Sequence, residues 1–151
     1  MKKFFAWGCA LCLAIWATAC QTSKNSYKSA HEVPYTVVRN YFFTDEKPLP
    51  ITPKITDEHI FHSMFGMAAV MGIDGQPTKI NFKKEFVVAV VYPPTDRHTE
   101  LSPLSLHDDG ETLTFTYKEQ IGQKNTWTMQ PMLIIAVNRK YQTHKVVLKK
   151  Q

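Results

Sequence analysis

The sequence predicts a small, mainly β domain of the α+β class: an antiparallel β-barrel or sandwich of six to eight strands with one short helix. A continuous apolar run over residues 86–92 is typical of a strand buried on both faces. Leu113, Phe115 and Tyr117 alternate with polar residues, which indicates a strand buried on one face. The sequence Asp-Asp-Gly at residues 108–110 is a hairpin signal directly before this alternation. Many strands with short links favour an antiparallel arrangement over alternating strands and helices.

The remaining elements are predicted one by one along the chain. Residues 35–43 are rich in Val, Tyr and Phe and predict the first strand. Residues 47–53 carry three prolines, so we expect an extended connector there. Thr56 is the expected start of the helix, which has an apolar stripe at helical spacing, and Gly66 is its expected C-terminal cap. Turn chemistry follows over 73–77. Further strands are expected around residues 101–106 and 146–148, and one or two over 126–129 and 132–137, with a turn over 121–125.

The N-terminus has the layout of a bacterial secretory signal. Lys2 and Lys3 precede an uncharged apolar stretch over residues 4–17, and polar residues follow Cys20. Small residues directly before Cys20 predict a lipoprotein signal, cut before that cysteine and acylated on its thiol. Ala17 departs from this motif, which usually has Leu or another larger aliphatic there. A plain signal peptide or an uncleaved anchor is the alternative.

The leader divides the chain into three expected parts. Residues 1–19 are the signal peptide, residues 20–33 a lipidated flexible tether, and residues 34–151 a single β-rich domain. The lipid on Cys20 predicts attachment to the outer membrane. The periplasmic face is favoured over the cell surface because no acidic cluster follows Cys20.

Composition narrows the classes of function. Removal of the leader leaves 16 basic and 13 acidic residues, a formal charge of +3 that is too small to indicate a nucleic-acid partner. Cys9 and Cys12 lie in the leader, and Cys20 would carry the lipid. The mature chain is therefore expected to have no free thiol, no disulfide and no cysteine metal site.

No group of residues predicts catalysis, a metal ion or a cofactor. His59 and His62 lie one helical turn apart, but no zinc-binding motif surrounds them, and we expect both to be exposed. Asp108 and Asp109 are expected to be turn residues rather than a catalytic pair, because a glycine follows them. The sequence contains no GxSxG, Walker or Rossmann pattern. We therefore expect a protein that is not an enzyme.

Two polar segments form the candidate binding site. The first follows the strongest predicted strand and is expected to be a loop stiffened by two prolines, and the second is expected to be a hairpin loop. Arg97 and Lys124 lie near their tips, and a rigid loop with one basic side chain suits the specificity pocket of a trypsin-like protease. An ordinary soluble hairpin would have the same composition. The candidate protease-binding residues are Pro93, Pro94, Thr95, Asp96, Arg97, His98, Gln123, Lys124 and Asn125.

Three stretches between residues 35 and 141 carry a resemblance: YTVVRNYFF, FGMAAVMGIDGQPTKINFKKEFVVAVV and MLIIAVNRKY. They resemble a group of small lipoproteins of Bacteroidetes that are described as hypothetical. Phe65-Gly66, Pro77 and Asn81-Phe82 also resemble the C-terminal domain of PrcB-type lipoproteins, which are associated with secreted proteases; Asn81 departs from the Asp of that pattern. A lipid tether with a compact β domain is similar to the architecture of the potempins, lipoprotein inhibitors of proteases.

The resemblance implies a lipid-anchored protein-binding domain that inhibits a secreted protease by placing a loop in its active-site cleft. Two alternatives stay open. One is a structural or assembly lipoprotein of the outer membrane, and the other is a small-ligand-binding β-barrel lined by aromatic side chains. The expected partners are the membrane, through the lipid on Cys20, and the protease. No cofactor and no nucleic acid is expected.

Overall fold

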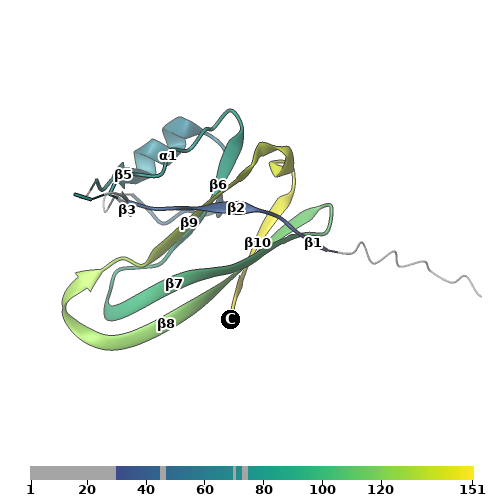
Figure 1. Cartoon of the computed structure of the whole chain (residues 1–151). Helices are drawn as coiled ribbons and strands as arrows, with labels where there is room; N and C mark the ends of the chain where they lie inside the picture. The colour runs from purple at the N-terminus through teal and green to yellow at the C-terminus, as the bar shows by residue number, and fades with distance from the viewer. Residues whose placement is uncertain (1–29, 45–46, 70, 73–74) are drawn as a thin grey trace, which may run out of the picture.

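The computed structural model describes residues 30–44, 47–69, 71–72 and 75–151 (Figure 1). The expected signal peptide, residues 20–29 of the expected tether and part of the expected turn over 73–77 lie outside these residues. The described strands are β1 (His31–Glu32), β2 (Tyr35–Val38), β3 (Tyr41–Phe43), β4 (Lys54–Ile55), β5 (Phe65–Met67), β6 (Glu85–Val91), β7 (Thr95–Asp108), β8 (Thr112–Met129), β9 (Met132–Asn138) and β10 (Lys145–Lys150). The described helices are α1 (Glu58–Met64) and the single-turn η1 (Arg139–Tyr141).

The strands form two four-stranded sheets and one small pair, β3 with β5. The central sheet has the order β2-β9-β6-β4, and the outer sheet has the order β1-β7-β8-β10. Every pair is antiparallel except β10 with β8. The mainly β class with one short α-helix is confirmed, as a sandwich rather than a closed barrel. The strands outnumber the expected six to eight because two-residue strands such as β1 and β4 have no periodicity that a sequence could show.

One long hairpin, bent back on itself, supplies the middle of both sheets. β6 continues through residues 92–94 into β7, and β8 continues through residues 130–131 into β9. Prolines at residues 93, 94 and 131 suit this bend because they donate no hydrogen bond to a neighbouring strand. The hairpin reverses after Asp108, where the Asp109 carboxylate accepts hydrogen bonds from two backbone amides of the turn. The predicted Asp-Asp-Gly turn is confirmed.

The central sheet lies between two hydrophobic cores. The face of β6 and β9 toward the outer sheet buries Phe86, Val88, Val90, Leu133, Ile135 and Val137. The opposite face buries Val87, Ala89, Ile134 and Ala136 against α1 and the β3–β5 pair. Figure 1 shows α1 and the β7–β8 pair on opposite sides of β6 and β9. Burial on both faces explains the continuous apolar run, so the prediction for residues 86–92 is confirmed.

The ends of α1 differ from the expectation. The N-cap is Asp57 rather than Thr56, because the Asp57 side chain accepts a hydrogen bond from the backbone N–H of Ile60 at 2.9 Å. The expected cap at Gly66 is wrong: Gly66 lies in β5 and is the register partner of Phe42 in β3. A Cβ at residue 66 would lie 2.3 Å from the Phe42 ring. Glycine is therefore explained by the close approach of an aromatic ring and not by the end of a helix.

The N-terminal part of the domain also differs from the expected structure in two places. The tether was expected to reach residue 33, but β1 pairs with β7 and Val33 is buried in the core between the sheets. The described domain therefore includes β1, whose two polar residues have no apolar pattern. The single strand expected over 35–43 is two strands, because Asn40 has a φ of 61° and turns the chain between β2 and β3.

Candidate functional site

The two segments predicted as binding loops are strands of one ribbon. Thr95, Asp96, Arg97 and His98 lie in β7, Gln123, Lys124 and Asn125 lie in β8, and Pro93 and Pro94 lie in the link before β7. Arg97 is the register partner of Lys124, so the fold brings the two segments together. The loop assignment holds for Pro93 and Pro94 but is wrong for the other candidate residues, and so is the turn over 121–125. A strand exposed on both faces lacks apolar alternation, so its sequence resembles that of a loop.

We call residues 95–100 of β7 and 120–129 of β8 the distal ribbon. It extends beyond the cores: every residue from 118 to 128 is exposed or half-buried. The register shifts on both sides of Arg97, because β8 carries extra residues opposite β7 there. Such bulges bend a ribbon and redirect side chains out of the regular ladder. Arg97 therefore lies at an irregular position of an ordered pair of strands.

The two basic residues of the distal ribbon are held differently. Lys124 Nζ lies 3.0 Å from Asp96 Oδ2, and 72% and 51% of these side chains are exposed. An exposed ion pair of this kind contributes little, because water screens it. Arg97 is exposed and makes no ion pair with another described residue. Arg97 is thus the more available cation for a partner.

Two exposed apolar side chains of the distal ribbon were not predicted from the sequence. Ile121 and Trp127 are 60% and 55% exposed in an otherwise polar segment. A tryptophan among polar residues was the one signal that could have indicated this surface, since Trp and Arg are enriched at protein interfaces. Asn125 Nδ2 is buried without a hydrogen-bond partner among the described residues.

The distal ribbon lies far from the start of the described chain. Figure 1 shows β1 at one end of the molecule and the bend of β7 and β8 at the opposite end. A domain that is tethered through the residues before β1 would present the distal ribbon away from its anchor.

Two tyrosine hydroxyls meet at the base of the distal ribbon. The Oη atoms of Tyr92 and Tyr117 lie 3.1 Å apart. Burial, reinforced by the hydrogen bond with Tyr117, raises the pKa of Tyr92 well above its usual range. Lys150 Nζ donates to Glu119 Oε2 at 2.6 Å, and this contact raises the pKa of Lys150. These contacts join β10 and the link after β6 to β8 where the distal ribbon leaves the core.

We expect the protein to lose stability above about pH 10, and Tyr92→Phe to make this loss shallower. The pKa of Tyr92 is higher in the folded state than in the unfolded chain, so folding favours the neutral phenol. Its contribution is fully present below the unfolded pKa and is lost as the pH rises toward the folded one. Urea unfolding of both proteins between about pH 8 and about pH 11 measures the slopes. Equal slopes above pH 10 would contradict the assignment to Tyr92.

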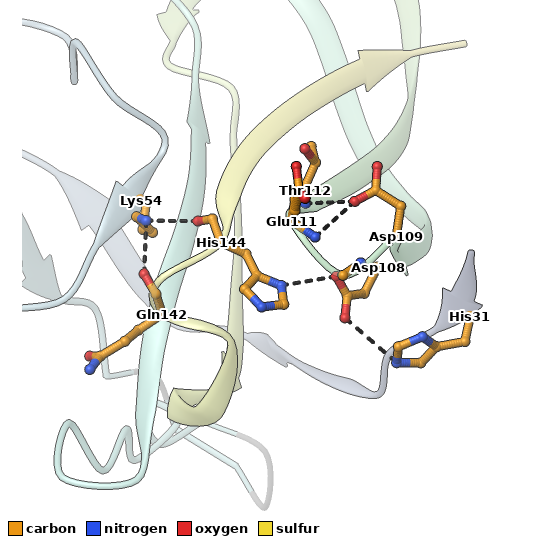
Figure 2. A network of polar contacts seen from close by, with 9 residues as sticks. His31, Lys54, Asp108, Asp109, Glu111, Thr112, Gln142 and His144 are labelled. Carbon is orange, nitrogen blue, oxygen red and sulfur yellow. Dashed lines mark hydrogen bonds and ion pairs between the residues drawn. The ribbon is translucent and has the colours of Figure 1, made fainter. Parts of the chain in front are cut away.

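A second polar cluster lies at the opposite end of the outer sheet (Figure 2). The Asp108 side chain is 4% exposed, and its carboxylate lies 2.9 Å from Nδ1 of His144 and 3.7 Å from Nε2 of His31. The Gly110 N–H donates to the same carboxylate at 2.8 Å. Lys54 Nζ donates to two backbone carbonyls of the segment before β10. The cluster joins β1, the hairpin turn and the segment before β10. Asp108 was expected to be a turn residue but is the last residue of β7, and only its carboxylate contacts the turn. Nothing in the sequence indicated its histidine partners.

We expect Asp108→Ala to lower the free energy of unfolding by about 1.5–3 kcal/mol, because it removes buried hydrogen bonds to a charged group. His31→Ala is the control, since 58% of the His31 side chain is exposed and its contact is the longer one. We expect this change to cost less than about 1 kcal/mol. Chemical denaturation measures both variants. Equal losses would contradict the structural role of the buried carboxylate.

The other candidate groups lie apart from the distal ribbon. His59 and His62 are exposed on α1, as predicted, and His62 Nε2 lies 3.9 Å from the Glu58 carboxylate. Within the described ranges, no three His, Cys, Asp or Glu side chains are placed to hold a metal ion. No helix in the described part of the chain is long and apolar enough to cross a membrane.

Comparisons with known proteins assign no family. No family model matches the chain, and neither a curated protein nor a solved structure matches it. The resemblance to small lipoproteins, to the PrcB-type domain and to the potempins therefore stays a prediction.

Proposed function

We propose that the protein is a lipid-anchored protein-binding domain that inhibits a secreted protease by covering the active-site cleft with the distal ribbon. The observation that carries this proposal is an ordered pair of strands outside both cores that exposes Arg97 and Trp127. Cross-strand pairing of Arg97 with Lys124 and of Thr95 with Met129 orders the ribbon around these residues before they bind. Less entropy is then lost on binding than with a flexible loop.

In this mechanism Arg97 occupies the specificity pocket of the protease. The register shifts on both sides of Arg97 favour it, because bulges turn a side chain out of the ladder. Lys124 is the weaker candidate, since its ammonium group already contacts the Asp96 carboxylate.

Of the two alternative functions, the structure is compatible with a structural or assembly lipoprotein and gives little support to a small-ligand barrel. The distal ribbon would also serve a structural or assembly lipoprotein whose partner is another protein of the envelope. The small-ligand barrel has little support, because the sheets do not close on each other. Fully buried side chains, among them Phe86, Phe115 and Ile135, fill the space between the sheets.

The test is a titration of the chain that starts at Gln21 against serine, cysteine and metalloproteases, including those secreted by the same organism. A chain that starts at Gln21 keeps every element that the structure describes. The expected result is tight, stoichiometric inhibition of one class. A folded chain that inhibits no protease of the panel would favour the structural lipoprotein instead.

A further inference from the structure

We infer that the outer edge of β8 accepts an extended segment of a protein partner, which adds as a strand in line with β10 and places an apolar side chain in a groove beside Tyr117. This inference rests on the proposed protein-binding function and specifies how the partner binds.

The outer edge of β8 is occupied along only part of its length. β10 pairs with residues 112–117, and the Gln151 N–H donates to the Tyr117 carbonyl at 2.9 Å. From Lys118 onward, no strand in the described ranges pairs with this edge. The edge therefore continues past β10 as a row of backbone groups without a neighbouring strand, which is a template for a further strand.

The hydrogen bonds show which residues face this edge. The Glu111 carbonyl, directly before β8, accepts from the Lys145 N–H, and the Tyr117 carbonyl accepts from Gln151. Odd-numbered residues of this segment thus direct their backbone groups toward β10. Pro103 agrees with this assignment: it is the β7 partner of Tyr117 and has no N–H to donate.

The same alternation extends beyond the end of β10. The β7–β8 register is regular from Tyr117 to Ile121. Glu119 and Ile121 therefore direct their N–H and C=O groups to the open edge, away from β7. An added strand would bind to these groups through main-chain hydrogen bonds, which supply affinity without requiring a particular sequence.

An apolar groove of about 200 Å³ lies where β10 ends, at the start of this open edge. Its lining includes Pro50 and Ile51 of the connector, Tyr92 after β6, Tyr117 of β8 and Leu148 of β10. As predicted, the connector contains no strand, so it leaves the groove open, and Ile51 is fully exposed at its wall. An added strand directs every second side chain to the face of the sheet that carries Tyr117. The groove thus selects an apolar residue at one position of the partner segment.

Charge distinguishes a foreign segment from a second copy of this chain. Antiparallel pairing of two β8 edges about Ile121 would set Lys118 opposite Lys124, and like charges at opposed positions destabilise a pair of strands. Lys118 is exposed and makes no ion pair with another described residue. The segment that fits best carries an acidic residue near Lys118 and an apolar residue at the groove.

The test is a selection of random linear peptides of about twelve residues, displayed on phage, against the chain that starts at Gln21. We expect enriched peptides with an apolar and an acidic residue, and we expect Ile121→Pro to bind them at least about 10-fold more weakly than Ile121→Ala. Both variants lack the isoleucine side chain, but only proline removes the N–H that faces the open edge. Proline is tolerated there because that N–H contributes to no ladder.

A second variant tests the groove. Ile51→Ser should weaken the same peptides, whereas Leu49→Ser should not, because Leu49 lies on the same connector but outside this groove. Ile51 is fully exposed, so its replacement tests the inference even if Ile121→Pro fails to fold. Equal binding of the peptides by Ile121→Pro and Ile121→Ala would overturn the inference, and so would a selection that enriches no peptide. Inhibition in the protease panel without peptide binding would refute strand addition alone, and peptide binding without inhibition would refute the protease partner alone.

Discussion

Phe61→Ala is expected to lower the free energy of unfolding by about 3–5 kcal/mol. Phe61 is fully buried on α1, and its ring stacks on Phe65 with 5.0 Å between ring centroids. The rings of Tyr41 and Phe82 lie 5.2 and 5.5 Å from it. Removal of the ring leaves a cavity between α1 and the central sheet that these neighbours fill only in part. Urea unfolding followed by circular dichroism measures the change.

Ile60→Ala is the matched control for this prediction. Ile60 is the preceding residue of the same helix and is 54% exposed, so we expect its replacement to cost less than about 1 kcal/mol. Phe61→Leu keeps part of the apolar volume and provides a measurable intermediate if Phe61→Ala does not fold. Similar losses for Ile60→Ala and Phe61→Ala would contradict the placement of the core between α1 and the central sheet.

Arg97→Ala is expected to weaken protease inhibition by about 30-fold or more, the effect of losing a basic hot spot of at least 2 kcal/mol. Arg97 is exposed between two register shifts and contributes to no core or described ion pair. Its replacement should therefore leave the folding equilibrium nearly unchanged. The measurement is the inhibition constant against the protease that the panel identifies, together with the unfolding midpoint of the variant.

Lys124→Ala is the comparison for Arg97→Ala. The Lys124 side chain lies opposite Arg97 and is held by Asp96, so we expect its removal to weaken inhibition by only a few-fold. A larger effect of Lys124→Ala would exchange the roles of the two residues. Full inhibition by both variants would contradict occlusion through a basic side chain.

Predictions from the sequence succeeded where the physical cause is local. The turn after Asp108 forms because aspartate side chains satisfy amides within the turn itself. The run over 86–92 identified β6 because a strand covered on both faces must be apolar throughout. The connector over 47–53 was recognised because proline cannot donate to a ladder. In each case the residues of one short segment are enough to determine its local structure.

Predictions failed where the same residue type is compatible with two different local structures. Gly66 fits a helix end, but here it accommodates the ring of Phe42 from another strand. Gly122 and its polar neighbours fit a turn, but they belong to β8, where cross-strand pairing and not burial maintains the strand. Polar composition alone does not distinguish an exposed strand from a loop.

By itself, the sequence determined the mainly β class, the short helix, the buried strand β6 and the hairpin turn, because apolar periodicity and turn chemistry act over a few residues. It also carried the expectation of a lipid on Cys20, which depends on local motif alone. Only the tertiary structure decided that Arg97 lies opposite Lys124, that Tyr92 meets Tyr117 and that His31 and His144 flank Asp108. These partners are far apart in sequence, and the bend of one long hairpin between two sheets sets their register, which no local pattern encodes.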